Sequence, residues 1–202
     1  MPRSLLDGAL KAADRASRGA AIGAGLLLLA AALLVAVDVT LRKLANVTLG
    51  GADELSGYAL AIGSAWSFAF VLLQRGNVRI DALYQHLPRP LAAVCDLLAV
   101  LALLVFVSLV AWHGWGVMAN SFNVGARSNS ALGVPLAIPQ GLWWLGYAWF
   151  VLCCALLLLR SGAALLAGDW ATVNRLAGAH SVQDDAADEL AHARAVRERA
   201  AR

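Results

Sequence analysis

The sequence predicts an all-α integral membrane protein, in which four transmembrane helices form a bundle with a short interfacial helix and a charged helical tail. The first reason is composition. Of the 202 residues, 60% are hydrophobic and only 14% are charged, and the mean hydropathy is +0.69, whereas a soluble domain is about 45–50% apolar and about 25% charged. The second reason is that the charged residues are concentrated at the two ends of the chain and in short segments between apolar runs. A chain with this pattern needs an apolar solvent around it.

Four apolar runs are long enough to cross a hydrocarbon core of about 30 Å as helices, which takes about 20 residues. Each run is expected to be helical, because lipid offers no partner for backbone N–H and C=O groups. The chain then divides into an N-terminal segment (1–18), a four-helix membrane domain (19–160) and an interfacial helix with a charged tail (161–202). The predicted spans lie at about 20–40, 55–74, 91–113 and 138–159.

The first run follows Arg15 and Arg18, as the apolar core of a signal peptide follows a basic segment. The run is long, however, and it ends at Asp38 and Arg42. A cleaved signal has a shorter core and a site of small residues. We therefore expect an uncleaved span.

The distribution of basic residues predicts the orientation of the spans, because segments rich in Lys and Arg stay in the cytoplasm. Most basic residues flank the spans on one side, and three lie on the other. Both termini and the segment 74–90 are therefore predicted to be cytoplasmic. The first group is Arg3, Lys11, Arg15, Arg18, Arg75, Arg79, Arg89, Arg160 and Arg175, and the second is Arg42, Lys43 and Arg127.

The sequence offers no pattern for catalysis, a cofactor, a metal or nucleic acid. The formal net charge is +3, but the basic residues flank apolar runs and form no stripe interleaved with aromatic residues. The three cysteines, Cys95, Cys153 and Cys154, lie inside apolar runs and are expected to be buried structural thiols, since no Cys/His spacing suits zinc. His86 and His113 fall on opposite sides of the predicted membrane and cannot form an axial haem pair.

Two acidic positions stand near the outer ends of the first two spans. Asp38 lies four residues before Arg42, and we favour an i,i+4 ion pair over an ion or proton site. Asp53 and Glu54 directly precede the second span, where carboxylates can cap free N–H groups and complement the helix dipole. The alternative role for Asp53 and Glu54 is contact with another subunit.

Asp96 is the only charged residue that enters the inner part of the third span. A lone carboxylate in lipid is costly, so its side chain should face protein. We favour a structural ion pair with Arg89 or Arg79 over a transport site. Ser, Thr and Asn are also sparse within the four spans, so the polar lining of a complete substrate pathway is missing.

The segment 74–90 carries the most distinctive residue pattern in the sequence. A span led by an acidic residue, followed by Arg-Gly-x-x-Arg-Ile-Asp and then Leu-Pro, resembles the small membrane subunit of tripartite ATP-independent periplasmic (TRAP) transporters, the DctQ family. The likeness covers roughly residues 15–165 and departs at Asn77, where many family members have His. The matching residues are Glu54, Tyr58, Arg75, Gly76, Val78, Arg79, Ile80, Asp81, Leu87 and Pro88.

The resemblance implies a three-protein system in the bacterial inner membrane. A periplasmic solute-binding protein (DctP-like) captures an organic acid, and a large membrane subunit (DctM-like) carries the solute and the coupling ion, usually sodium. The small subunit is implied to be a fixed brace without catalytic, cofactor or metal sites. Residues implied at the subunit interface, or with structural roles, are Glu54, Asp53, Tyr58, Arg75, Arg79, Asp81, Arg89 and Asp96, and those implied in docking the binding protein are Lys43 and Arg127.

Two other functions remain open from the residues alone. The chain could form a self-sufficient oligomeric exporter or channel, or it could anchor a redox enzyme in the membrane. The first predicts transport by this chain alone. The second predicts a reactive group such as a haem, for which the sequence offers no ligand pair.

Overall fold

Four long apolar helices and one short helix make up the part of the chain that the computed structural model describes, which is residues 3–76, 87–178, 190 and 197. Each of the four long helices is long and apolar enough to span a membrane. The all-α fold with four spans and a short additional helix is therefore confirmed, while most of the charged tail lies outside the described residues. The helices are α1 (Arg3–Ala45), α2 (Ala52–Leu73), α4 (Arg89–Asn123), α5 (Ala137–Leu166) and α6 (Trp170–Ala177).

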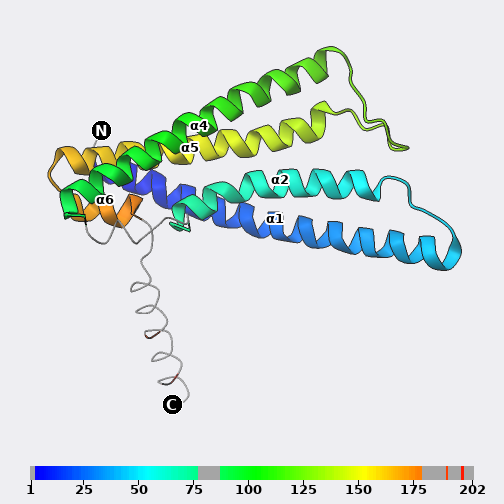
Figure 1. The fold of residues 1–202 in the computed structure, drawn as a ribbon, viewed down its shortest axis with the longest axis horizontal. Coiled ribbons are helices and arrows are strands. Elements are labelled where there is room, and N and C mark those ends of the chain that lie inside the picture. The colour runs from blue at the N-terminus through cyan, green and yellow to red at the C-terminus, as the bar shows by residue number, and fades with distance from the viewer. Residues whose placement is uncertain (1–2, 77–86, 179–189, 191–196, 198–202) are drawn as a thin grey trace.

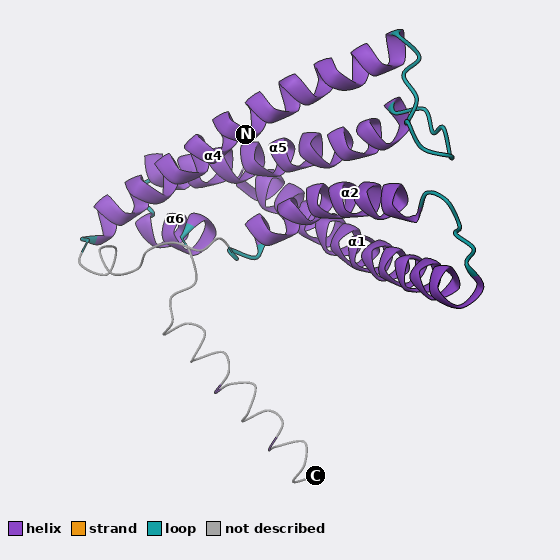
Figure 2. Ribbon diagram, turned by 45° about the vertical axis from the view of Figure 1, so that its right-hand side comes forward, coloured by secondary structure: helices purple, strands orange, loops and turns teal. Residues whose placement is uncertain are grey.

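The long helices form two antiparallel hairpins, α1 with α2 and α4 with α5 (Figure 1). The hairpins pack together through α2 and α5, so the order across the molecule is α1, α2, α5, α4. They converge at the end that carries α6 and diverge at the opposite end, where the connections 46–51 and 124–136 lie (Figures 1 and 2). We call these two ends the α6 end and the loop end.

The helices run beyond the predicted spans because their amphipathic or apolar character continues. The described part of the N-terminal segment joins the first span as one unbroken helix, α1. Leu6, Ala13 and Ser17 recur on one face of that helix and are buried there, as expected for helical periodicity. In α4 the run continues through Trp115 and Phe122, so the helix ends about three turns after the predicted boundary.

The main hydrophobic core lies where the two hairpins meet, and α5 provides the largest share of it. Cys153, Cys154 and Leu157 of α5 are buried against Ala69 and Leu72 of α2. Burial of the first two thiols agrees with the prediction. Cys95 does not, because it is exposed on α4; an apolar stretch of sequence alone does not show which face of a helix meets protein and which faces outward.

Close packing of α2 on α5 depends on a glycine. A Cβ atom at Gly146 would lie 2.9 Å from the Cβ atom of Ala65 and 3.0 Å from that residue's backbone carbonyl carbon. Both distances are too short for a side chain. Small residues thus set the separation of the two central helices, as is common in membrane helix pairs.

The two outer helices expose wide apolar faces. On α1, Leu26, Leu29 and Leu33 are more than half exposed, as are Phe106 and Trp112 on α4. A soluble monomer rarely exposes apolar faces of this extent, so lipid or another protein must cover them. The outer surface therefore has the character expected of a membrane protein.

Helix α6 is docked on protein. Gly168, with a φ of 71°, turns the chain after α5, and the side chain of Asp169 caps α6 by accepting a hydrogen bond of 3.0 Å from the Thr172 backbone N–H. Val173 is fully buried and packs with Ala93 and Ala164. The amphipathic segment predicted at an interface thus also packs against the start of α4 and the end of α5.

Candidate functional site

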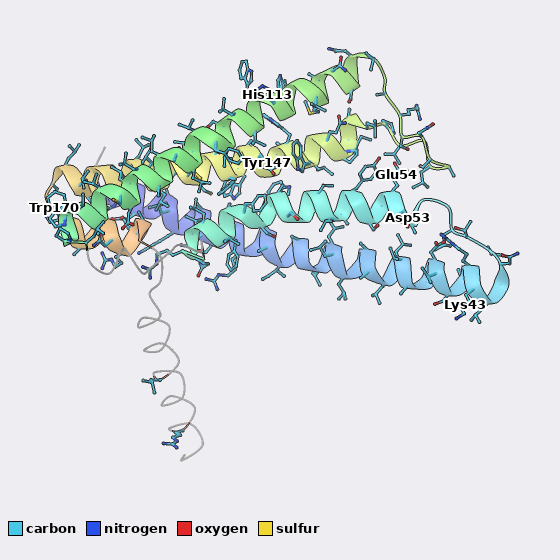
Figure 3. All side chains as sticks on the ribbon, viewed as in Figure 1. Lys43, Asp53, Glu54, His113, Tyr147 and Trp170 are labelled. Carbon is cyan, nitrogen blue, oxygen red and sulfur yellow. The ribbon has the colours of Figure 1, made fainter. Side chains whose placement is uncertain are left out.

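At the loop end, Glu54 ties the two hairpins together. It lies in the first turn of α2, and its carboxylate accepts hydrogen bonds from the Tyr58 hydroxyl and from the hydroxyl of Ser130 in the α4–α5 connection. The Ser130 oxygen also accepts from the Leu132 backbone N–H at 3.2 Å. Figure 3 shows Glu54 facing this connection. One carboxylate therefore fixes a loop that is distant in sequence against the start of α2.

The α4–α5 connection has a defined shape of its own. Arg127 forms an isolated β-bridge with Pro135 and donates a side-chain hydrogen bond of 3.0 Å to the Gly133 carbonyl. The backbone N–H of Ser128 donates to Val134 O at 2.9 Å. These bonds hold the loop in a narrow turn that presents Ser130 to Glu54.

Gly51 provides a second contact between the hairpins. Its φ is 110°, a conformation that L side chains rarely adopt. A Cβ atom there would lie 2.4 Å from Cδ1 of Leu132. The Leu132 side chain therefore occupies the space above Gly51, and only glycine fits both the backbone and the contact.

Asp38 organises the α1–α2 connection. Its carboxylate accepts from Arg42 Nη2 at 2.5 Å, from the Thr48 hydroxyl at 3.0 Å and from the Leu49 backbone N–H at 2.7 Å. The predicted i,i+4 pair with Arg42 is confirmed. The two further donors show that this carboxylate also folds the loop back onto the end of α1.

The predicted capping of α2 by its acidic residues is wrong for Glu54. The N-cap is Gly51 and has no side-chain hydrogen bond; Glu54 is engaged instead with Tyr58 and Ser130. Asp53 is exposed in the same turn. Both carboxylates still lie in the first turn, where negative charge complements the helix dipole. Sequence spacing could not reveal that a loop 76 residues away competes for Glu54.

At the α6 end, ion pairs and hydrogen bonds join helices that are far apart in sequence. Arg160 Nε of α5 donates to Asp7 Oδ1 of α1 at 2.6 Å. Gln74 Nε2, just after α2, donates to Asp14 Oδ1 of α1 at 2.6 Å. The start of α1 is therefore linked to the ends of both central helices.

Ser17 adds a buried contact in the same region. Its hydroxyl accepts from the Trp149 indole N–H at 2.9 Å and lies 4.0 Å from Cys153 Sγ. Sequence analysis did not single out Asp7, Asp14 or Ser17. The available signal was the presence of isolated acidic and hydroxyl side chains on the otherwise basic or apolar face of a helix.

The remaining predicted residues fall into three groups. Tyr58 lies beside Glu54; Lys43, in the last turn of α1 (Figure 3), and Arg127 lie at the loop end. Arg75 follows α2 with a φ of 56°. Arg79, Asp81 and the side chain of Arg89 lie outside the described residues.

Asp96 is buried, with 1% of its surface exposed. A Cβ atom at Gly178 would lie 3.3 Å from its Oδ2 atom, so the carboxylate lies under the end of α6. The expected pairing with Arg79 or Arg89 involves side chains that are not described and stays a prediction. Burial against protein rather than lipid agrees with the expectation.

Four membrane-spanning helices fixed at both ends by polar contacts define a multi-pass membrane protein. Among the described residues, no group of three or more His, Cys, Asp or Glu side chains could hold a metal ion. The family model described as tripartite ATP-independent periplasmic transporters, DctQ component, matches residues 31–163. The chain therefore belongs to the DctQ family and is a small membrane subunit of a TRAP transporter. No curated protein and no solved structure matches it.

The matched region covers the loop end fully but only part of the α6 end. It includes the contacts of Asp38 and Glu54 at the loop end. It excludes the first part of α1, with Asp7 and Asp14, and it excludes α6. The contacts that tie the start of α1 to Gln74 and Arg160 therefore join one residue outside the matched region to one inside it.

Proposed function

We propose that the chain is a non-transporting scaffold, which braces the large membrane subunit and helps dock the periplasmic binding protein during ion-coupled uptake of an organic acid. Membership of a transporter family supports the setting. One observation carries the scaffold role: the charged side chains lie at the two ends of the spans, and none occurs within 19–37, 55–74, 97–126 or 128–159. A path for an organic acid through this chain would need polar or charged groups at membrane depth.

The contacts at the ends support the same role. Glu54 and Asp38 fix the loop end, and Arg160 with Asp7 fixes the α6 end. Each carboxylate joins one part of the chain to another part. Such bonds make a rigid support, as a brace requires, and leave the apolar faces of α1 and α4 for lipid and the large subunit.

The proposed location is the bacterial inner membrane with both termini in the cytoplasm. The excess of Lys and Arg at the α6 end supports this orientation. The start of α1 and α6 lie at the same end of the molecule (Figure 1), as an even number of spans requires. The loop end, with Lys43 and Arg127, then faces the periplasm and the binding protein.

The proposed subunit interface includes Arg75, Arg79, Asp81 and Arg89 of the segment 74–90, and the buried Asp96 has a structural role beside it. The test is to reverse both charges, Arg79→Asp with Asp81→Arg, and to purify the chain in mild detergent. We expect less of a large multi-span partner to co-purify. Survival of both assembly and uptake would remove this segment from the interface.

The same purification discriminates between functions. Recovery of a large membrane subunit with the wild-type chain supports the brace. Recovery of a homo-oligomer alone supports the self-sufficient exporter or channel instead. A haem absorbance spectrum in the purified chain would favour the redox anchor.

A further inference from the structure

A basic pocket of about 510 Å³ opens at the α6 end, between α1, the end of α2, α5 and α6. Its volume lies within the range of about 300–1,000 Å³ typical of ligand sites. Four helices and the two residues that follow α2 contribute to it, so it is a concave site formed by tertiary packing. We call it the basic pocket. Its positively charged lining residues are Lys11, Arg15, Arg18, Arg75 and Arg175.

The positive charge of the basic pocket exceeds its negative charge by a wide margin. Asp14 is the one carboxylate among its lining residues. Gln74 donates to Asp14 Oδ1 at 2.6 Å, and Arg18 lies 3.8 Å from Oδ2. Asp14 is thus already engaged with two neighbours. Asp7, which pairs with Arg160, adds a second negative charge close to Lys11 and Arg175, so among the described residues five basic side chains face two carboxylates. An anion from outside the chain would balance this field.

The basic residues of the pocket come from three separate parts of the chain. Lys11, Arg15 and Arg18 are spaced by four and three residues, which places them along one side of α1. Arg175 approaches from α6, and Arg75 from the end of α2. Because α6 is anchored by buried Val173, its arginine is presented from a fixed position.

The rest of the lining favours a lipid over a soluble anion. Leu10, Leu73, Leu157 and Leu176 line the same pocket. Leu157 is buried in the core, whereas Leu73 is partly exposed and is the last residue of the membrane-spanning helix α2. The apolar part of the pocket therefore adjoins the end of a span at Leu73. A phosphate group with acyl chains attached would match the basic and the apolar parts together.

We propose that the basic pocket binds the phosphate headgroup of an anionic phospholipid. Basic pockets between membrane helices are suited to such headgroups. The bound lipid would hold the start of α1, the end of α2 and α6 together from outside, adding to the bonds of Asp7 and Asp14. The proposal does not depend on transport, and most of the basic residues involved lie outside the matched family region 31–163.

The experiment uses the full chain in mild detergent and native mass spectrometry. Phosphatidylglycerol and phosphatidylcholine with identical acyl chains are titrated in parallel, and inorganic phosphate serves as the soluble arm. The test variant is Lys11→Gln with Arg175→Gln, two exposed residues of the pocket. The matched control is Lys43→Gln with Arg127→Gln, which removes the same charges at the loop end.

We expect the wild type to bind phosphatidylglycerol more tightly than phosphatidylcholine. The pocket variant should lose about tenfold or more in that affinity, since each basic residue near an anionic lipid contributes about a factor of five. The control variant should retain it. Equal affinity in the pocket variant and the wild type, or no preference between the two lipids, would overturn the proposal.

Two further readouts keep the result decisive. Complete displacement of the lipid by inorganic phosphate at equal concentration would show a soluble-anion site and overturn the lipid assignment. If the double variant does not fold, Lys11→Gln is compared with Lys43→Gln, because both are exposed lysines on α1. A loss of phosphatidylglycerol binding in the first alone supports the pocket, and equal binding in both contradicts it.

Discussion

The two ends of the molecule are held by carboxylates in different ways. At the loop end, Glu54 accepts only from hydroxyl groups, and Asp38 accepts from a hydroxyl and a backbone N–H as well as from Arg42. At the α6 end, Asp7 pairs with the guanidinium of Arg160. The first arrangement fixes the shape of two loops, whereas the second joins charged helix ends within a region of excess positive charge. The carboxylates thus determine the loop conformations at the loop end, and an ion pair joins two helices at the α6 end.

The largest effect on stability is expected at Gly51, where a positive φ and a close contact with Leu132 coincide. Gly51→Ala should destabilise the protein by about 2–4 kcal/mol, because the backbone is strained at a φ of 110° and the new Cβ atom would collide with Leu132. Thermal unfolding in detergent measures the change. Gly50→Ala is the matched control: its φ is 63° and its nearest neighbour would be 3.7 Å away, so we expect about 1 kcal/mol.

A second substitution separates the two causes. Leu132→Ala in the Gly51→Ala background should restore part of the lost stability by removing the collision, leaving the backbone strain. If the double variant is less stable than Gly51→Ala by the full cost of Leu132→Ala alone, the two residues do not interact and the contact is wrong.

Both ends contain an ion pair, Arg160 with Asp7 at the α6 end and Arg42 with Asp38 at the loop end, and the pair at the α6 end is the one that joins two helices far apart in sequence. Arg160→Gln removes the ion pair with Asp7 and should lower the melting temperature by a few degrees, because Arg160 is largely buried, with 11% of its side chain exposed. High salt should lower the wild-type melting temperature by only part of this difference, because a partly buried pair is screened less than an exposed one. Arg18→Gln is the control, since the Arg18 side chain is 57% exposed and its loss should change little.

Loss of the Glu54 contact should loosen one loop without unfolding the protein. Glu54→Gln weakens the charge-assisted bonds to Tyr58 and Ser130. We expect faster hydrogen exchange in residues 128–134 and little change in α5. Asp53→Asn, exposed in the same turn, is the matched control and should leave exchange in this loop unchanged. Equal exchange in both variants would remove Glu54 as the link between hairpins.

The smallest effect on stability is expected from the proposed docking residues. Lys43→Gln with Arg127→Gln should lower the melting temperature only slightly, because both side chains are exposed and backbone hydrogen bonds also hold the loop that Arg127 contacts. The double variant should instead slow association with the solute-binding protein, most clearly at low salt. Surface plasmon resonance against the assembled complex measures this, and unaltered association at low salt would exclude both residues from docking.

The sequence predicted the parts of the structure that follow from local pattern. Apolar runs of sufficient length located the four spans, and four-residue spacing located the pair of Asp38 with Arg42. The start of the first helix was placed too late, because Leu6 and Ala13 are buried by contacts that no local window contains. The exposed position of Cys95 has the same origin, since burial depends on which helix face meets a neighbour.

The contacts that hold the two ends together depend on residues far apart in the chain. Glu54 and Ser130 are 76 residues apart, and Asp7 and Arg160 are 153 apart. Predicting such pairs requires the arrangement of the hairpins, in which α2 packs on α5. The acidic start of α2 could be recognised in the sequence, but its partner in the α4–α5 connection could not.

The central claim is that the chain supports transport without forming the path itself. The most direct test is uptake of the proposed substrate, an organic acid, into proteoliposomes that contain the chain alone, the large subunit alone or both, each with the solute-binding protein and an ion gradient. We predict uptake only when both membrane subunits are present. Ion-dependent uptake with this chain as the sole membrane protein would contradict the account.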